Sequence, residues 1–309
     1  MTSRPRLALT TALLAGGMAL SACVTTAPDR ATTTPGRLAV TASFYPIEYA
    51  VQQVGGSLVS VRSLTKPGAE PHDVELSPKD VAGLSTSALV VYAKGFQPAV
   101  DTAVDQEARD HALDVAPVAR LDRAAPAEEG GRAQEGAKDP HFWLDPHRYA
   151  DVATAIAERL TAADPAHAAD YRSNAAVFTS RLSQLDADLR AGTTSCRSRE
   201  LVTSHAAFGY LSDRYGFTQV PIAGLSPDVE PSAAKLAEVA SFVAAHHVTT
   251  IYAETLVEPA FADTVAKNTG ATVATLDPIE GLTSTSAGRD YVEVMRSDLT
   301  ALRAGQQCS

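Results

Sequence analysis

Short β-rich runs alternate with helical patterns in two separate blocks of this 309-residue chain. The strand candidates are residues 38–44, 58–64, 88–93 and the weaker 112–116 in the first block, and 200–205, 218–224, 249–254 and 271–277 in the second. Helical patterns lie between them at 47–54, 233–245 and 259–268, and Ser77 with Pro78 has the character of a helix start. Strands that alternate with helices favour parallel sheets covered on both faces, so the sequence predicts an α/β fold built from two such blocks.

The section between the blocks has a different pattern. From residue 147 to 189 there is no strand signal, and Pro165 interrupts the run, with Asp164 as the expected cap of the next helix. The apolar positions approximate a helical stripe: Tyr171, Val177, Phe178, Leu182, Leu185 and Leu189. A helix over about 165–191 would be about 40 Å long, enough to run past both blocks and join them.

The N-terminus has the pattern of an export signal. Arg4 and Arg6 precede a short apolar run that ends in Leu-Ser-Ala-Cys at Cys23. This ending resembles the cleavage site of bacterial lipoproteins, which implies a signal peptide over 1–22 and a lipid on Cys23. Residues 23–36 are rich in Thr, Pro and Ala, so we expect a flexible tether from the membrane to the folded part.

Charge and cysteine content narrow the setting further. The formal net charge is −10 and the chain has no basic run, which disfavours a nucleic-acid partner. Cys196 and Cys308 are the two cysteines that remain after the signal. Because an even pair outside the cytoplasm usually forms a disulfide, we expect one here. No later segment is long and apolar enough to be expected to cross a bilayer.

Four residues with metal-binding chemistry fall at strand-to-helix junctions. They are His72, His141, His205 and Asp277. Ligands of open α/β sheets bind beyond the carboxyl ends of the strands, where these junctions meet, so the sequence predicts a site built from both blocks. Four other histidines lie on helical or helix-end patterns and are interpreted as structural or solvated: His111, His167, His246 and His247.

Several ordered motifs carry a resemblance to a known family. They are "GAEPHDVELSPKD", "DPHFWLDPHRYADVA", "TSHAAFGYLSDRYGF", "IAGLSPDVEPS" and "ETLVEPAFADTVAKNTGA", within about residues 37–305. Together they resemble the substrate-binding lipoproteins of bacterial ABC importers for zinc and manganese. The resemblance implies an N-terminal α/β lobe over 37–163, a long rigid linking helix over 164–192, a C-terminal α/β lobe over 193–309, and a metal site in the cleft between the lobes.

The resemblance also assigns the ligands. It implies that the first Asp-Pro-His supplies His141, whereas the second copy, at 145–147, starts the next helix with Asp145 as its cap. Three histidines and Asp277 favour Zn²⁺, while manganese importers of the family carry a Glu in place of His205. Glu70 and Glu254 are expected to lie behind the ligands, although either could reach the metal.

The implied function is capture of Zn²⁺ outside the cytoplasm by a monomer anchored in the cell membrane, and its delivery to an ABC permease and its ATPase. A manganese-binding member of the family is the alternative. A zinc hydrolase is a distant one, because four protein ligands would leave no water to activate. No sequence feature indicates an adhesin or a phosphate binder. The loop 124–138 is acidic but has no histidine, which puts a metal-gathering role for it in doubt.

Overall fold

The computed structural model describes residues 36–126, 136–227 and 229–309, and these residues belong to one unit. The predicted signal peptide 1–22, Cys23 and all of the predicted tether except Gly36 lie outside the described residues. The middle of the acidic loop, residues 127–135, lies outside them as well.

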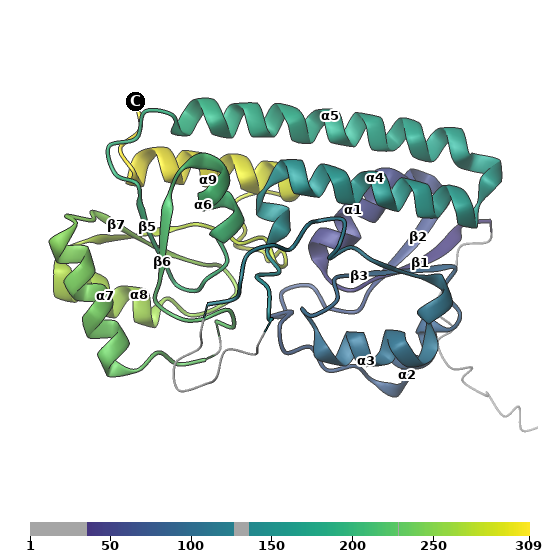
Figure 1. Cartoon of the computed structure of the whole chain (residues 1–309), viewed down its shortest axis with the longest axis horizontal. Coiled ribbons are helices and arrows are strands. Elements are labelled where there is room, and N and C mark those ends of the chain that lie inside the picture. The colour runs from purple at the N-terminus through teal and green to yellow at the C-terminus, as the bar shows by residue number, and fades with distance from the viewer. Residues whose placement is uncertain (1–35, 127–135, 228) are drawn as a thin grey trace, which may run out of the picture. The chain divides into compact units, whose positions relative to one another are not determined.

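Two parallel sheets have the same strand order. The N-terminal sheet is ordered β2-β1-β3-β4 and the C-terminal sheet β6-β5-β7-β8, and every strand pair is parallel. The strands are β1 (Leu38–Ala42), β2 (Val59–Ser63), β3 (Leu89–Tyr92), β4 (Ala112–Asp114), β5 (Glu200–Thr203), β6 (Thr218–Pro221), β7 (Thr250–Ala253) and β8 (Thr272–Thr275). The predicted α/β fold with two parallel sheets flanked by helices is confirmed (Figure 1).

The helices connect these strands. They are α1 (Tyr45–Gly55), α2 (Pro78–Leu84), α3 (Pro98–Glu107), α4 (Pro146–Ala163), α5 (Ala168–Thr193), α6 (Gly209–Tyr215), α7 (Ala233–Ala245), α8 (Ala260–Thr269) and α9 (Tyr291–Gly305). Helix α2 begins as predicted, with Ser77 and Asp80 forming a reciprocal capping box and Pro78 at its first position.

Both faces of the sheets are covered, which the alternation of buried side chains shows. In β3, Leu89 and Val91 belong to the large hydrophobic cluster, whereas Val90 and Tyr92 pack in a separate cluster with residues of α2 and α3. Successive strand residues point to opposite faces, so a strand buried on both sides is apolar at every position. The fully apolar sequence of β3 therefore follows from its position in the middle of the N-terminal sheet.

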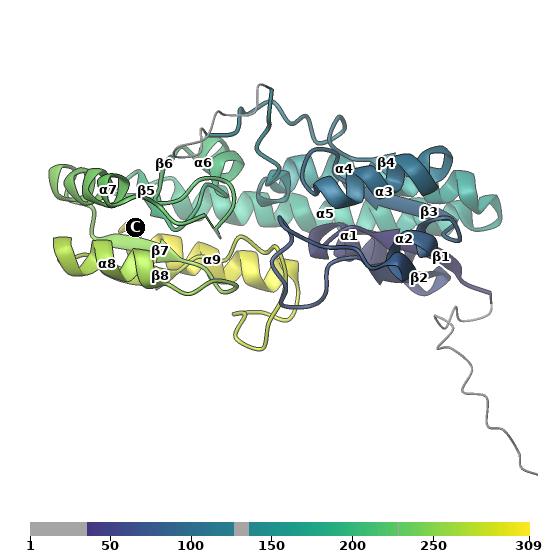
Figure 2. The ribbon, with the colours of Figure 1, turned by 90° about the horizontal axis from the view of Figure 1, so that it is seen from below.

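The long helix α5 runs along both halves of the unit and packs on α1, α4, α6 and α9 (Figures 1 and 2). It begins later than predicted, because residues 165–167 form a 3₁₀ turn. The Asp164 carboxylate accepts hydrogen bonds from the ring of His167 and the hydroxyl of Tyr171 instead of capping the helix. The predicted stripe is buried except at Val177, which is 60% exposed, since one helical step of about 100° turns it away from the buried Phe178.

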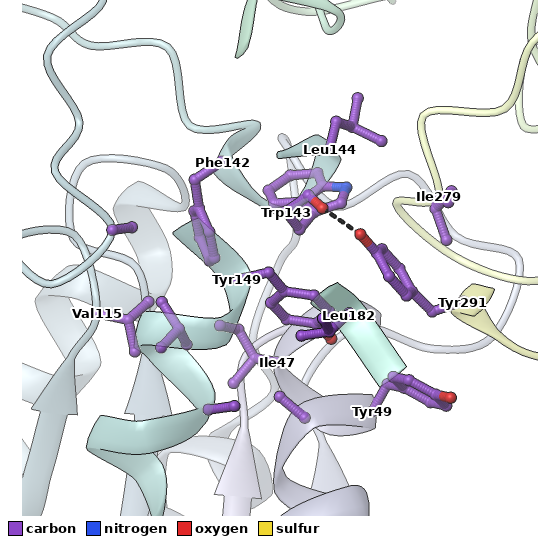
Figure 3. Packing of buried hydrophobic residues seen from close by; sticks show 14 of the residues in the cluster. Ile47, Tyr49, Val115, Phe142, Trp143, Leu144, Tyr149, Leu182, Ile279 and Tyr291 are labelled. Atoms are coloured by element: carbon purple, nitrogen blue, oxygen red, sulfur yellow. Dashed lines mark hydrogen bonds between the residues drawn. The ribbon is translucent and has the colours of Figure 1, made fainter. Parts of the chain in front are cut away.

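One core joins the two halves beside the linking helix. Trp143 donates a hydrogen bond through its indole N–H to the Pro278 carbonyl (2.7 Å). Its own carbonyl accepts a hydrogen bond from the Tyr291 hydroxyl (2.5 Å), which Figure 3 shows. Trp143 comes shortly after His141 in sequence, and Pro278 precedes α9. The loops from the two halves are thus tied together by buried hydrogen bonds and aromatic packing.

The predicted disulfide between Cys196 and Cys308 is present. It ties the C-terminus to the segment after α5, where the Ser309 N–H also donates to the Ser195 carbonyl (3.1 Å). Among the described residues, none of the helices combines the length and the apolar character that a membrane span requires.

Candidate metal centre

Four buried side chains meet between the carboxyl ends of the two sheets. His72 lies in the loop after β2, His141 in the connection from β4 to α4, His205 two residues after β5, and Glu280 between β8 and α9. One ligand atom from each lies within 4.8 Å of the others, and these four residues are the one such group of His, Cys, Asp and Glu among the described residues. Their exposed fractions are 9%, 0%, 0% and 1% in the same order.

Glu280 lies at the centre of the group. Its Oε1 atom is 3.2 Å from the Nε2 atom of His72, 2.9 Å from that of His141 and 3.3 Å from that of His205. Tetrahedral ligands about 2.0–2.1 Å from a Zn²⁺ ion lie roughly 3.3 Å from one another, so these separations suit one small cation between the four side chains.

The structure brings three of the four predicted residues together, and Asp277 lies outside the group. Its carboxylate accepts hydrogen bonds from the Ile279 N–H (2.8 Å) and the Thr255 hydroxyl (2.9 Å), and burial raises the pKa of Asp277 to about 6. The Asp277 side chain therefore shapes the turn after β8, with Ile279 at a φ of 58°. This turn presents Glu280, three residues later in "LDPIEG", to the histidines.

The first Asp-Pro-His orients its own histidine. The Asp139 Oδ1 atom accepts from the His141 N–H (2.9 Å) and lies 2.8 Å from the ring Nδ1. The other carboxylate oxygen of Asp139 is 3.5 Å from the Arg123 Nε atom. A carboxylate behind the far nitrogen fixes the ring and its tautomer, which leaves Nε2 for a metal.

The second Asp-Pro-His starts α4, as the resemblance implied. Asp145 caps the helix by accepting a hydrogen bond from the His147 N–H, and its carboxylate also pairs with Arg214. The His147 side chain is 60% exposed and its Nδ1 lies 3.9 Å from Asp151. The His147 side chain therefore does not belong to the ligand group, although it is close to His141 in sequence.

His205 is supported by a carboxylate from a different strand. Glu254, the residue after β7, places Oε1 2.5 Å from the ring Nδ1. Glu70 occupies a different position, because its Oε2 atom accepts from the backbone N–H groups of His72 (2.8 Å) and Asp73 (3.4 Å). The other carboxylate oxygen of Glu70 lies 3.9 Å from the Nε2 atom of His72, but neither glutamate belongs to the group of four whose ligand atoms lie within 4.8 Å of one another.

The electrostatics of the group favour a bound cation. Burial lowers the pKa of His141 and His205, but their hydrogen bonds to carboxylates outweigh it, so both pKa values are raised, that of His205 strongly. Burial lowers the pKa of His72 and outweighs the opposing effect of Glu280. Burial would raise the pKa of Glu280, yet the three histidines hold that pKa well below its usual range. The group therefore keeps a buried negative charge among three imidazoles.

Three of the remaining histidines have local contacts. The His111 Nε2 atom lies 3.0 Å from the Leu84 carbonyl, His167 pairs with Asp164, and His246 stacks on Phe242.

Three imidazoles and one carboxylate, with further carboxylates behind two of the rings, form a ligand set that suits Zn²⁺.

The sequence from residue 40 to 305 matches the family model described as ZnuA, zinc-uptake complex component A, periplasmic. The chain belongs to this ZnuA family. Among curated relatives, the zinc-binding protein AdcA of Streptococcus pyogenes is 33% identical over 287 residues, covering 87% of this chain and 56% of AdcA. The chain thus spans about half the length of that relative. The high-affinity zinc uptake system protein ZnuA of Bacillus subtilis is 33% identical, covering 86% of this chain and 87% of its own length.

Two solved structures share the fold of this chain. The Zn(II)-bound ZnuA-like domain of Streptococcus pneumoniae AdcA superposes with a TM-score of 0.72 at 33% identity, covering 88% of this chain and 99% of that domain. A mutant of the laminin-binding adhesin Lmb from Streptococcus agalactiae gives a TM-score of 0.78 at 34% identity, covering 87% of this chain and 99% of Lmb.

Proposed function

We propose that this chain captures Zn²⁺ on the extracytoplasmic side of the cell membrane and delivers it to the permease of an ABC importer, which its ATPase drives. The observation that carries the proposal is the buried group of His72, His141, His205 and Glu280. The group is built from both halves of the unit, so it can enclose an ion between them. Membership of a family described as a zinc-uptake component supports the same role.

Zinc is favoured over manganese by the donor atoms. Mn²⁺ suits oxygen ligands, whereas imidazoles suit Zn²⁺. The second carboxylate that would shift the balance, Asp277, is engaged by Thr255 and the Ile279 N–H. The Zn(II)-bound structure of the AdcA domain supports the assignment.

A hydrolase is disfavoured by the same arrangement. A catalytic zinc keeps an open position for water and a general base beside it. Here four side chains converge, and the nearby carboxylates of Asp139 and Glu254 are hydrogen-bonded to the backs of the ligand rings. We therefore infer a binding protein and not an enzyme.

The proposed anchoring depends on the N-terminus. A lipid on Cys23 and a tether over 23–36 would keep the monomeric chain close to the permease. The disulfide between Cys196 and Cys308 supports an oxidising compartment outside the cytoplasm.

Metal analysis of the chain purified without a metal-affinity tag tests the proposal. We expect one tightly bound Zn²⁺ per chain and retention of zinc when manganese competes in excess. More than one tight site, or preference for manganese, would overturn the zinc assignment. Zinc-dependent ester or peptide hydrolysis would overturn the binding-protein role.

A further inference from the structure

The turn that presents Glu280 to the histidines has a strained backbone. Ile279, the residue directly before Glu280, is buried and has a φ of 58°. This left-handed conformation is rare for a β-branched residue, because it brings Cβ close to the following carbonyl oxygen. It persists only where surrounding contacts determine it, so the contacts of the turn are part of what places the Glu280 carboxylate.

Each of the three residues of this turn has a main-chain hydrogen bond. The Ile279 N–H donates to the Asp277 carboxylate (2.8 Å), and the Pro278 carbonyl accepts from the indole of Trp143 (2.7 Å). The Asp277 N–H donates to the Oδ1 atom of Asp298, which lies in α9 (3.0 Å). The bond that fixes the start of the turn therefore comes from a helix 21 residues away in sequence.

Asp298 is a costly residue for its position in α9. Its side chain is buried, and its second carboxyl oxygen, Oδ2, has no hydrogen-bond partner among the described residues. Burial raises the pKa of Asp298 well above its usual range, which favours the neutral carboxyl. An apolar side chain of similar shape would fill the space without burying an unpaired oxygen, so the packing of α9 alone does not account for a carboxyl here.

We propose that Asp298 is a positioning residue of the metal centre, because its hydrogen bond to Asp277 holds the turn that directs Glu280 toward the three histidines. This inference rests on the proposed function. Asp298 is not a member of the ligand group and acts through the turn. Loss of its acceptor oxygen leaves the buried Asp277 N–H unpaired and releases the start of the turn. Ile279 can then leave its strained conformation, and the Glu280 carboxylate moves away from the position that it needs to bind zinc.

The zinc affinities of two Asp298 variants of the full mature chain, measured by competition with a chelator, test the hydrogen bond. Asp298→Leu keeps the branching of the side chain but cannot accept a hydrogen bond, so we expect its zinc affinity to be about tenfold lower. Asp298→Asn keeps an acceptor oxygen without a charge and should bind zinc within about twofold of the unmodified chain. If Asp298→Leu does not fold, Asp298→Ala, which removes the acceptor without adding volume, is measured in its place with the same expected loss.

Two further comparisons separate positioning from a general loss of stability. The matched control, Leu302→Ala, truncates a buried side chain one turn farther along α9 and should lower the melting temperature of the metal-free chain while zinc affinity stays within about twofold. In a Glu280→Gln background, Asp298→Leu should lower zinc affinity by less than about twofold, because the ligand that it positions is already lost. Its effect on the melting temperature of the metal-free chain should be similar in both backgrounds.

The outcomes separate the positioning role from the function. Unchanged zinc affinity in the variant without the acceptor would overturn the proposal, and so would a loss in Asp298→Asn as large as that in Asp298→Leu. The same fold-loss with and without the Glu280 carboxylate would show that Asp298 does not act through Glu280. Absence of tight Zn²⁺ binding by the unmodified chain would instead refute the proposed function.

Discussion

The two halves of the metal centre support their histidines by different means, although they stand at the ends of sheets with the same strand order. In the N-terminal half, His141 is held by Asp139, two residues away in the same loop. In the C-terminal half, His205 is held by Glu254, which is 49 residues away and comes directly after the neighbouring strand β7. The first pairing is a local property of the loop, whereas the second exists only when β5 and β7 are paired.

His72 is supported differently again. Its ring lies edge-on to Phe96, with ring centroids 4.6 Å apart, and burial lowers its pKa. The N-terminal half thus holds one imidazole against a carboxylate and one against an aromatic ring. The C-terminal half combines a carboxylate-supported imidazole with Glu280. The support of His205 therefore depends on the pairing of β5 with β7, whereas the support of His141 lies within its own loop.

The largest expected effect comes from the disulfide, which closes a loop that contains the whole C-terminal half. We expect the double substitution Cys196→Ala and Cys308→Ala to lower the free energy of unfolding by about 4–5 kcal/mol, as the chain-entropy account gives for a loop of this length. Urea titration under identical conditions measures it. Hydrogen exchange should accelerate in β5 and β7 more than in β1 and β3, and an unchanged unfolding free energy would contradict the expectation.

Next in size is the loss of a ligand. His141→Ala should weaken Zn²⁺ binding at least about 100-fold, because it removes a bond to the metal. Loss of a residue that only supports a ligand from behind typically weakens binding by about 10–100-fold. His147→Ala is the matched control from the second Asp-Pro-His and should change affinity less than about twofold. Competition with a chelator of known affinity measures both, and equal losses would show that both copies take part in the site.

A smaller effect is expected from the carboxylates behind the rings, and it compares the two halves directly. Asp139→Asn and Glu254→Gln should each reduce zinc affinity by about 10–100-fold, since each leaves the ligand in place but loosens its orientation. Because the Glu254 contact depends on pairing of β5 with β7, its loss should be accompanied by lower thermal stability of the metal-free chain. Zinc affinities equal to that of the unmodified chain would show that these carboxylates do not support the ligands.

The smallest effect is the pH dependence of the metal-free protein. The pKa values of His141 and His205 are raised, so their contribution to stability is present below about pH 6.5 and is lost as pH rises through the raised values. The pKa of Asp277 is raised to about 6, so the stability of the folded chain also falls as pH rises from about 4 to 6 and this carboxyl ionises. His72 opposes this trend, because its pKa is lowered.

We therefore expect the melting temperature of chelator-treated protein to fall as pH rises from about 6 to 8. The further rise in melting temperature produced by Zn²⁺ should grow over the same range, because protons compete with the metal for the imidazoles. Melting curves with and without zinc check both trends. Metal-free protein that becomes more stable across this range would contradict the assigned pKa directions.

Much of the fold was accessible from sequence because its signals are local. Ser77 and Pro78 start α2 as predicted, α7 covers the predicted residues 233–245, and Asp145 caps α4. These features depend on a few neighbouring residues and on the period of the apolar positions. The histidines were accessible because they come after strands, and strands of a parallel sheet end together.

The carboxylates were harder to assign for a physical reason. Asp277 and Glu280 are three residues apart, and which of them faces the histidines depends on the turn that Asp277 itself stabilises and on Ile279 at positive φ. The place of Glu254 depends on the strand order, which sets β7 beside β5. Neither a turn of this kind nor the order of strands is encoded by residue spacing.

The measurement that tests the central claim most directly is the zinc affinity of Glu280→Gln compared with Asp277→Asn. If Zn²⁺ is held by three histidines and Glu280, the first variant should lose at least about 100-fold in affinity. The second, which changes only the contacts of Asp277 with the Ile279 N–H and the Thr255 hydroxyl, should lose no more than about tenfold. Both substitutions remove one negative charge and preserve shape, so long-range electrostatics cannot explain a difference between them. A larger loss for Asp277→Asn, or near-normal binding by Glu280→Gln, would contradict the proposed centre.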